Sequence, residues 1–240
     1  LASLENSSLA AYRGIPSLDD LNAIVVGYNN GVLLEIVSSK LAVSFPKLFT
    51  DTWYLGQING SLEAWFNDSY FSLVSSEITA TMPNIEVKGH FSLSRPKDQR
   101  YQSLSMIFGA EGLRVQDRND FVPHALAASL RDWLGVSLIG GSLQDLRFAY
   151  NGHTKFGDNR SSKRIELQTF FENIRVDYMP DWPSVFGANG EFHLKGLTTH
   201  IQIEEAKTLD IKGVSGNVRI NNEELQQNGT PDGINSAGVV

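Results

Sequence analysis

Apolar and polar residues alternate along most of this chain, and no other sequence feature constrains its fold as strongly. Such alternation is typical of β-strands with one buried and one wet face, because successive side chains point to opposite faces. Pairs such as Asn-Gly stand between many of these runs and favour hairpin turns, so we expect antiparallel meanders rather than crossover helices. The runs interpreted as strands are Gly31–Phe45, Gly60–Phe66, Ile85–Ser94, Ile165–Tyr178, Gly190–Gly196, Thr199–Ala206 and Gly216–Ile220.

One segment, Val122–Gly135, has the pattern of a short amphipathic helix lying on a sheet. Pro123 suits the first turn of a helix, and Gly135 suits a position just beyond its end. Ile15–Leu21 is a second candidate for a short turn of helix. We therefore predict a mainly β fold with one or two short helices. The apolar stripe of the longer helix consists of Leu126, Leu130, Trp133 and Leu134.

The composition excludes several classes of function. The 240 residues include 20 Lys and Arg against 27 Asp and Glu, a formal net charge of -7. This balance argues against a nucleic-acid partner, because phosphate binding requires a basic surface. Cysteine is absent, so disulfides and thiolate metal sites are impossible. No apolar run reaches the ~20 residues of a membrane helix, and the abrupt start at Leu1 leads us to expect a piece of a longer protein.

The chain divides into a long β-rich segment, residues 1–220, and a polar tail, residues 221–240, which we expect to be flexible. Pro16–Ile36 resembles Pro183–Ile203, since each has Pro-Ser, a strand, a Gly-bearing turn and a second strand. This similarity suggests a module used more than once in an extended sheet, although hairpins in general share the pattern. The repeat units would be residues 1–110 and 111–220.

Motifs that carry chemistry are missing. The sequence has no P-loop, no dinucleotide-binding fingerprint, no serine-hydrolase elbow and no zinc-protease motif. Ser44–Lys47 matches S-x-x-K, but a strand precedes it and the companion motifs of that enzyme class are absent. His193 and His200 lie on neighbouring predicted strands, yet no carboxylate or third ligand is apparent beside them, so we expect no metal. No catalytic residue and no cofactor is expected.

A Pro-Asp-Trp-Pro step interrupts the alternation after Tyr178. Pro180 and Pro183 cannot donate hydrogen bonds to a neighbouring strand, so we expect strand pairing to stop there. Trp182 would then be a packed plug at the corner, and Gly187 and Gly190 would allow the next hairpin to begin.

The same step raises the possibility of an enzyme acting on polysaccharide. Asp177 and Asp181 would be the carboxylate pair and Trp182 the sugar platform. Capping of turns and exposure to solvent explain the two aspartates better, so this hypothesis ranks last.

The two faces of Gly190–Ile220 differ in character. Glu191, His193, Lys195, Gln202, Glu204, Lys212 and Arg219 alternate with apolar residues, so one face is wet. The apolar face is either the core of a closed barrel or sandwich, or an open trough that must bind something. The pattern alone favours the closed core. The apolar residues, which are the candidates for lining a trough, are Phe192, Leu194, Ile201, Ile203, Leu209, Ile211, Val218 and Ile220.

Val122–Gly152 followed by Phe170–Gly196 resembles the bacterial AsmA-like superfamily, specifically its YhdP branch. The shared pattern is an amphipathic turn ending in Trp-Leu, a Gly-Gly step, a strand with an aromatic-Gly end, an aromatic-x-Pro-x-Trp-Pro step, and a Gly-x-x-Gly strand. The matching positions are Pro123, Trp133, Leu134, Gly140, Gly141, Tyr150, Gly152, Tyr178, Pro180, Trp182, Pro183, Gly187 and Gly190.

The resemblance implies an extended, curved antiparallel sheet that forms a taco-like apolar groove. It implies a protein of the Gram-negative periplasm, anchored in the inner membrane by a helix outside this sequence and reaching towards the outer membrane. Phospholipid would be the partner, with acyl chains sheltered in the groove. The alternative that remains is a non-catalytic β-sandwich, serving as a scaffold or protein-interaction module of the cell envelope.

Overall fold

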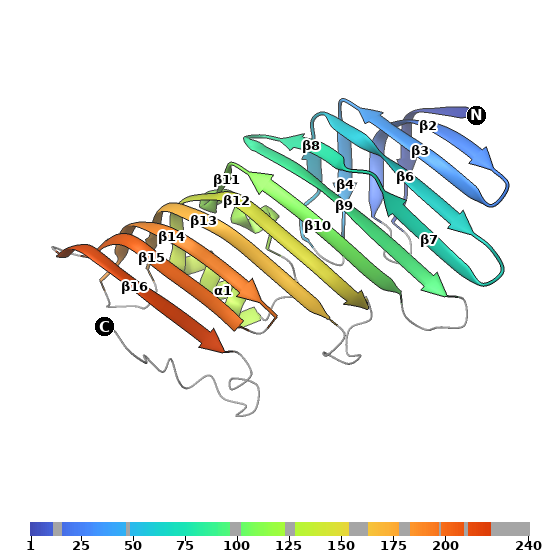
Figure 1. The fold of residues 1–240 in the computed structure, drawn as a ribbon. Coiled ribbons are helices and arrows are strands. Elements are labelled where there is room, and N and C mark those ends of the chain that lie inside the picture. The colour runs from blue at the N-terminus through green and yellow to red at the C-terminus, as the bar shows by residue number, and fades with distance from the viewer. Residues whose placement is uncertain are drawn as a thin grey trace.

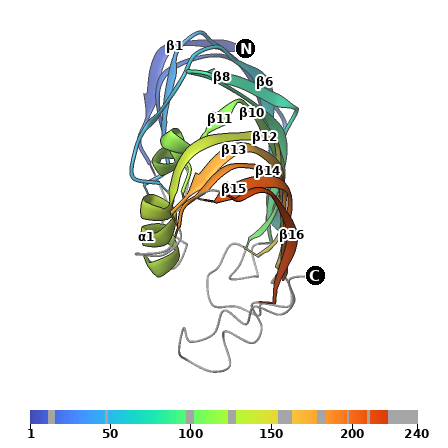
Figure 2. The same cartoon turned by 90° about the vertical axis from the view of Figure 1, so that its left-hand side faces the viewer.

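The computed structural model describes residues 1–11, 16–46, 49–96, 102–122, 128–153, 163–177, 183–196, 198–208 and 211–221. The strands of these residues form one antiparallel sheet, which Figure 1 shows as a long row of neighbouring arrows. Viewed along that row, the sheet curves into an arch (Figure 2). The predicted mainly β fold and its curved antiparallel sheet are therefore confirmed.

The elements follow one another along the chain. The strands before the helices are β1 (Ala2–Leu9), β2 (Ser17–Tyr28), β3 (Gly31–Ser38), β4 (Leu41–Ser44), β5 (Trp53–Leu55), β6 (Ile58–Phe66), β7 (Tyr70–Ser75), β8 (Ile78–Met82), β9 (Ile85–Pro96), β10 (Ser103–Glu111) and β11 (Leu113–Arg114). The 3-10 helix η1 (Val115–Asp120) and the α-helix α1 (Ala128–Ser137) come next. The last strands are β12 (Leu138–His153), β13 (Arg164–Val176), β14 (Val185–Lys195), β15 (Thr198–Thr208) and β16 (Ile211–Asn221).

Neighbours in the sheet are mostly neighbours in the sequence. From one end the order is β16, β15, β14, β13, β12, β10, β9, β7, β6, β3, β2, β4 and β5. β1 pairs with β2, β11 with β12, and β8 with both β6 and β9. The segment with η1 and α1 connects β11 to β12, and Figure 2 shows α1 beside one edge of the arch. This is the meander that the hairpin signals predicted.

Strands in the first half bend where the ladder is interrupted. β3 ends at Ser38 and β4 begins at Leu41, so the prediction of one strand over Gly31–Phe45 is wrong. Beside the break, Ser38 Oγ accepts a hydrogen bond from the Asn22 amide at 2.8 Å and donates one to the Asn22 carbonyl at 3.2 Å. The serine side chain thus replaces strand–strand bonds and satisfies the backbone of β2.

Strands in the second half bend at β-bulges instead. The register shifts between β12 and β13, β13 and β14, β14 and β15, and β15 and β16. Asp145 and Asn173 have positive φ angles of 46° and 51°, and Gly187 has one of 58°. The Asn173 amide donates to Asn189 Oδ1 at 2.8 Å. Because a bulge bends its strand, a series of bulges on neighbouring strands explains the curvature of the arch.

Two apolar clusters lie along the sheet. The first comprises Leu21, Ala23, Ile36, Leu41, Val43, Ile58 and Ala80. The second comprises Val115, Phe171, Ile174, Ala188 and Ala206.

The helix predictions are partly wrong. The segment from Ser17 to Leu21 lies in β2, where it pairs with β1 and β4, so tertiary pairing overrides the proposed helical turn. α1 is helical as expected, but it continues through Gly135, whose carbonyl accepts a hydrogen bond from Arg118 Nη2. Pro123 and Leu126 lie outside the described residues.

Candidate functional site

The strand register shows which side chains share a face. Leu194 on β14 lies opposite Leu167 on β13, which lies opposite Phe148 on β12. Phe148 in turn lies opposite Phe108 on β10. Directly opposed residues of an antiparallel sheet project from the same face, so these four side chains form one apolar row across four strands. We call the face that carries this row the inner face.

A second row crosses the same strands nearer the bulges. Ile203 lies opposite Gly190, Gly190 opposite Phe171, and Phe171 opposite Leu143. Leu143 then lies opposite Leu113 on β11. The row contains no polar side chain, so the apolar character of the inner face extends to the bend.

The inner face continues into the first half of the chain. Leu104 on β10 lies opposite Leu93 on β9, and Leu93 lies opposite Leu73 on β7. Leu73 is opposite Ala64 on β6, which is opposite Val32 on β3. Apolar residues thus follow one another from β15 to β3 without a charged residue in any of the three rows.

Exposure identifies the inner face as the concave one. Phe108, Phe148, Leu167 and Leu194 are half-buried although no second sheet covers them among the described strands. Ile107, which neighbours Phe108 but points the other way, is 52% exposed. Side chains crowd together on the concave side of a curved sheet and spread apart on the convex side. The pattern-based preference for a closed core is therefore wrong, because the strands curve as a single open layer.

The profile of the YhdP protein family matches residues 1–229. The chain belongs to the YhdP family. Membership suggests an envelope protein related to lipid transport, in a family that is not a known enzyme family. The curated proteins contain no significant match, and neither do the solved structures.

Four of the lining residues predicted for this YhdP-family chain, Phe192, Leu194, Ile201 and Ile203, lie on the inner face. Phe192, Ile201 and Ile203 pack against the cluster that contains Phe171 and Val115. Leu194 belongs to the first apolar row. The other predictions fall on Ile211, Val218 and Ile220 of β16, whose side chains are not described, and on Leu209, which lies outside the described residues. In the register, Val218 is opposite Ile201 and Ile220 is opposite Thr199.

Several glycines of the family pattern lie inside strands. Gly187 and Gly190 lie within β14, the first strand of the antiparallel pair β14–β15. Gly187 has the positive φ angle that its bulge requires. Gly141 has a φ angle of 105° within β12, while Gly140 lies beside it in the same strand.

The remaining positions of the pattern are only partly described. Pro183 lies two residues before the start of β14, and Trp133 lies on α1, although the side chain of Trp133 is not described. Tyr178, Pro180 and Trp182 lie outside the described residues, so the proposed plug at the corner stays a prediction.

The two histidines do lie side by side, with His193 directly opposite His200. Glu166 was not predicted as a neighbour of these histidines, yet its Oε1 lies 2.9 Å from His193 Nε2. Glu166 is distant in the sequence, and the hydrogen-bonded pair forms only because β13 and β14 are neighbours. No group of three possible metal ligands occurs among the described side chains.

Asp177, one of the two aspartates of the enzyme hypothesis, is engaged in structural contacts. Its pKa is lowered by a hydrogen bond from Ser184 and further by Arg175, whose Nη2 lies 3.3 Å from Asp177 Oδ2. An aspartate held ionised in this way suits the end of a strand better than general acid catalysis. Asp181 lies outside the described residues.

Much of the inner face was not predicted from the sequence. Phe108 lies on β10, which was not among the predicted strands, and Phe148 lies on β12, where only the family resemblance indicated a strand. The signal was present in the alternating sequence of Ser103–Glu111, where Leu104, Met106 and Phe108 share a face. No described helix is long and apolar enough to cross a membrane.

Proposed function

We propose that this chain is a segment of a periplasmic lipid-transport protein, whose inner face shelters the acyl chains of phospholipids. The observation that carries the proposal is the continuity of the apolar rows across strands β15 to β3. Membership of the YhdP family supports it. A single uncovered sheet face of this extent requires an apolar partner, because such patches are rare on soluble monomers.

The mechanism would be passive. Each methylene group that leaves water for the inner face contributes about 0.8 kcal/mol, so an acyl chain is held by many small contacts. Neighbouring strands lie about 4.8 Å apart, and each presents similar apolar side chains on the inner face. A lipid could therefore move from strand to strand, because no single deep binding site would have to release it. The headgroup would remain in water at the open edge of the arch.

In the complete protein, the arch would form part of a path between the inner membrane and the outer membrane. The proposal includes an anchor in the inner membrane, formed by a segment outside this sequence. A non-catalytic scaffold or interaction module is the alternative function. Its β-sandwich form requires a second sheet, whereas the described strands all belong to one.

Adjacent positions on β10 provide a direct test. A photoreactive benzophenone amino acid is placed at Phe108, on the inner face, or at Ile107, which is 52% exposed on the other face. The chain is then produced in the periplasm of a Gram-negative bacterium and irradiated. We expect phospholipid adducts, detected by mass spectrometry, at position 108 and not at 107. Equal labelling at the two positions, or none at either, would overturn the proposal and favour the scaffold.

A further inference from the structure

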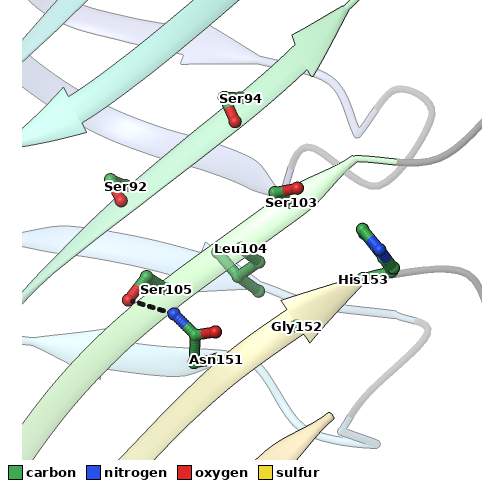
Figure 3. Close-up of a pocket in the computed structure, with 8 residues that line it drawn as sticks. All are labelled: Ser92, Ser94, Ser103, Leu104, Ser105, Asn151, Gly152 and His153. Carbon is green, nitrogen blue, oxygen red and sulfur yellow. Dashed lines mark hydrogen bonds between the residues drawn. The ribbon is translucent and has the colours of Figure 1, made fainter. Parts of the chain in front are cut away.

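The convex face carries a polar hollow of about 290 Å³ that the lipid proposal does not use. It is lined mainly by Ser92, Ser94, Ser103, Ser105, Asn151 and His153 (Figure 3). These side chains come from β9, β10 and β12, and they alternate with the inner-face residues of the same strands.

The register arranges these residues into two parallel rows that run across the strands. In the first row, Ser72 on β7 lies opposite Ser94, which lies opposite Ser103, which lies opposite His153. Successive members are therefore separated by about 4.8 Å, the spacing between strands. The row presents three hydroxyl groups and an imidazole in a line.

The second row lies beside the first. Ser92 is opposite Ser105, and Ser105 is opposite Asn151. The amide Nδ2 of Asn151 donates a hydrogen bond to Ser105 Oγ at 3.2 Å, as Figure 3 shows. This bond orients the amide within the hollow while its oxygen remains available as an acceptor.

The serine hydroxyl groups of the two rows can form further hydrogen bonds. The side chains of Ser92, Ser94 and Ser103 form no hydrogen bond with another described residue. A hydroxyl can donate one bond and accept two. Threonine would present the same group and favour a strand, whereas serine has no such preference. Strand formation therefore does not explain the concentration of serines on these strands.

Aromatic residues lie at the far end of the first row. Trp65 on β6 is opposite Ser72, and Gly31 on β3 is opposite Trp65. The ring of Tyr28 covers Gly31, since ring atoms lie 2.5 Å from the place that a Cβ would occupy. Tyr28 is 42% exposed, and its hydroxyl donates a hydrogen bond to Glu63. The row thus begins at aromatic rings and continues as hydroxyls.

We propose that these two rows bind a linear, uncharged glycan that lies across the strands. The strand spacing is close to the length of one sugar ring in an extended chain, so consecutive rings meet consecutive serines. The hydroxyls and the Asn151 amide supply donors and acceptors, and the rings of Tyr28 and Trp65 offer apolar surface to a sugar face. The second row has no other acidic or basic side chain between Glu63 at one end and Arg164 at the other, and His153 is the one such side chain in the first row. The surface therefore suits an uncharged chain.

The test is a titration of the isotope-labelled chain with oligomers of N-acetylglucosamine of two, four and six sugars, followed by NMR. We expect amide shifts confined to β12, β10, β9, β7, β6 and the end of β2 that carries Tyr28, and tighter binding of the longer oligomers. Replacing Ser94 and Ser103 together by valine should weaken binding by about 30-fold, because two hydrogen bonds of about 1 kcal/mol each are lost. Valine favours strands, so the fold should be retained, which circular dichroism checks.

Thr198→Val is the matched control, because Thr198 lies opposite Lys195 on the convex face of β15, away from the hollow. It should leave glycan binding unchanged. Absence of binding at about 10 mM oligomer, or an equal effect of the control, would overturn the proposal. Equally tight binding of an acidic glycan such as heparin would also overturn it, since the attraction would then be to charge. None of these outcomes bears on the inner face, so the lipid proposal is tested separately.

Discussion

Phe171 lies directly opposite Gly190 across β13 and β14, and its ring occupies the space that a side chain at position 190 would need. A Cβ built on Gly190 would lie 2.7 Å from Phe171 Cζ and 2.0 Å from the Gln202 carbonyl oxygen. Phe171 is only 9% exposed and belongs to the cluster at the bend of the arch. The glycine therefore allows an aromatic ring to fill the inside of the bend.

Gly190→Ala should destabilise the chain by about 1–3 kcal/mol, the usual range for overpacking, because a backbone carbonyl cannot move aside easily. Gly216→Ala is the matched control, since no atom lies within 4 Å of the Cβ that would be added there. Urea unfolding followed by circular dichroism measures both. A variant at position 190 as stable as the control would show that Phe171 does not pack there.

Asn173 should be sensitive to the shape of its replacement. Its φ angle of 51° is accessible to asparagine and glycine but costs a β-branched residue roughly 1–2 kcal/mol. Asn173→Val should therefore lower the free energy of unfolding by about this amount, whereas Asn173→Gly should be close to neutral. Thermal unfolding of the two variants provides the comparison. Equal stabilities would mean that the bulge at this position is absent in solution.

Asp120 should make the stability depend on pH. Burial raises the pKa of this carboxyl, and the nearby Asp51 and Asp117 raise it further. The native state then holds the proton more tightly than the unfolded chain, so stability falls as the pH rises through the raised pKa. Asp120→Asn should increase the free energy of unfolding near pH 7, by up to about 1 kcal/mol, and give no gain near pH 3.

The main-chain carbonyl of Asp120, which accepts a hydrogen bond from Trp53 Nε1 at 2.9 Å, remains in the asparagine variant. Urea unfolding at the two pH values distinguishes the charge from this contact. A gain of the same size at both pH values would contradict the assignment.

A charge on the inner face should impair lipid retention. Ile203→Asp places a carboxylate beside Gly190 and Phe171, where its ionised form has no partner. We expect the phospholipid that co-purifies per chain to fall about two-fold or more. Gln202→Asp changes the adjacent, outward-facing position and should not alter it. Circular dichroism must first show that both variants are folded, and equal lipid content in folded variants would contradict the inner-face assignment.

The alternation of apolar and polar residues predicted most of the sheet because a strand with one buried face must repeat every two residues. For the same reason, it predicted that Phe192, Ile201 and Ile203 share a face of the sheet. The bends could not be predicted in this way. A bulge adds one residue at Asn173 or Asp145, and such residues also suit turns, so local sequence does not separate the two.

Alternation also could not decide between a closed core and an open face. Leu194 and Leu167 would show the same pattern in a barrel, a sandwich or an arch. The difference depends on whether the first and last strands of the sheet meet, and no local feature of β16 or β5 encodes that. The contact between His193 and Glu166 was missed for a related reason, because only the register of β13 against β14 brings the two residues together.

The order of strands in the sheet has a consequence for how the chain tolerates change. Because nearly every strand pairs with segments next to it in the sequence, folding free energy is expected to be a sum of nearest-neighbour terms. Substitutions at Ile36 and Ile203, which lie in separate apolar clusters, should then have additive effects. Whole hairpins could be removed or duplicated in evolution with repacking confined to the junction, so the length of such an arch is free to follow the distance it must cover.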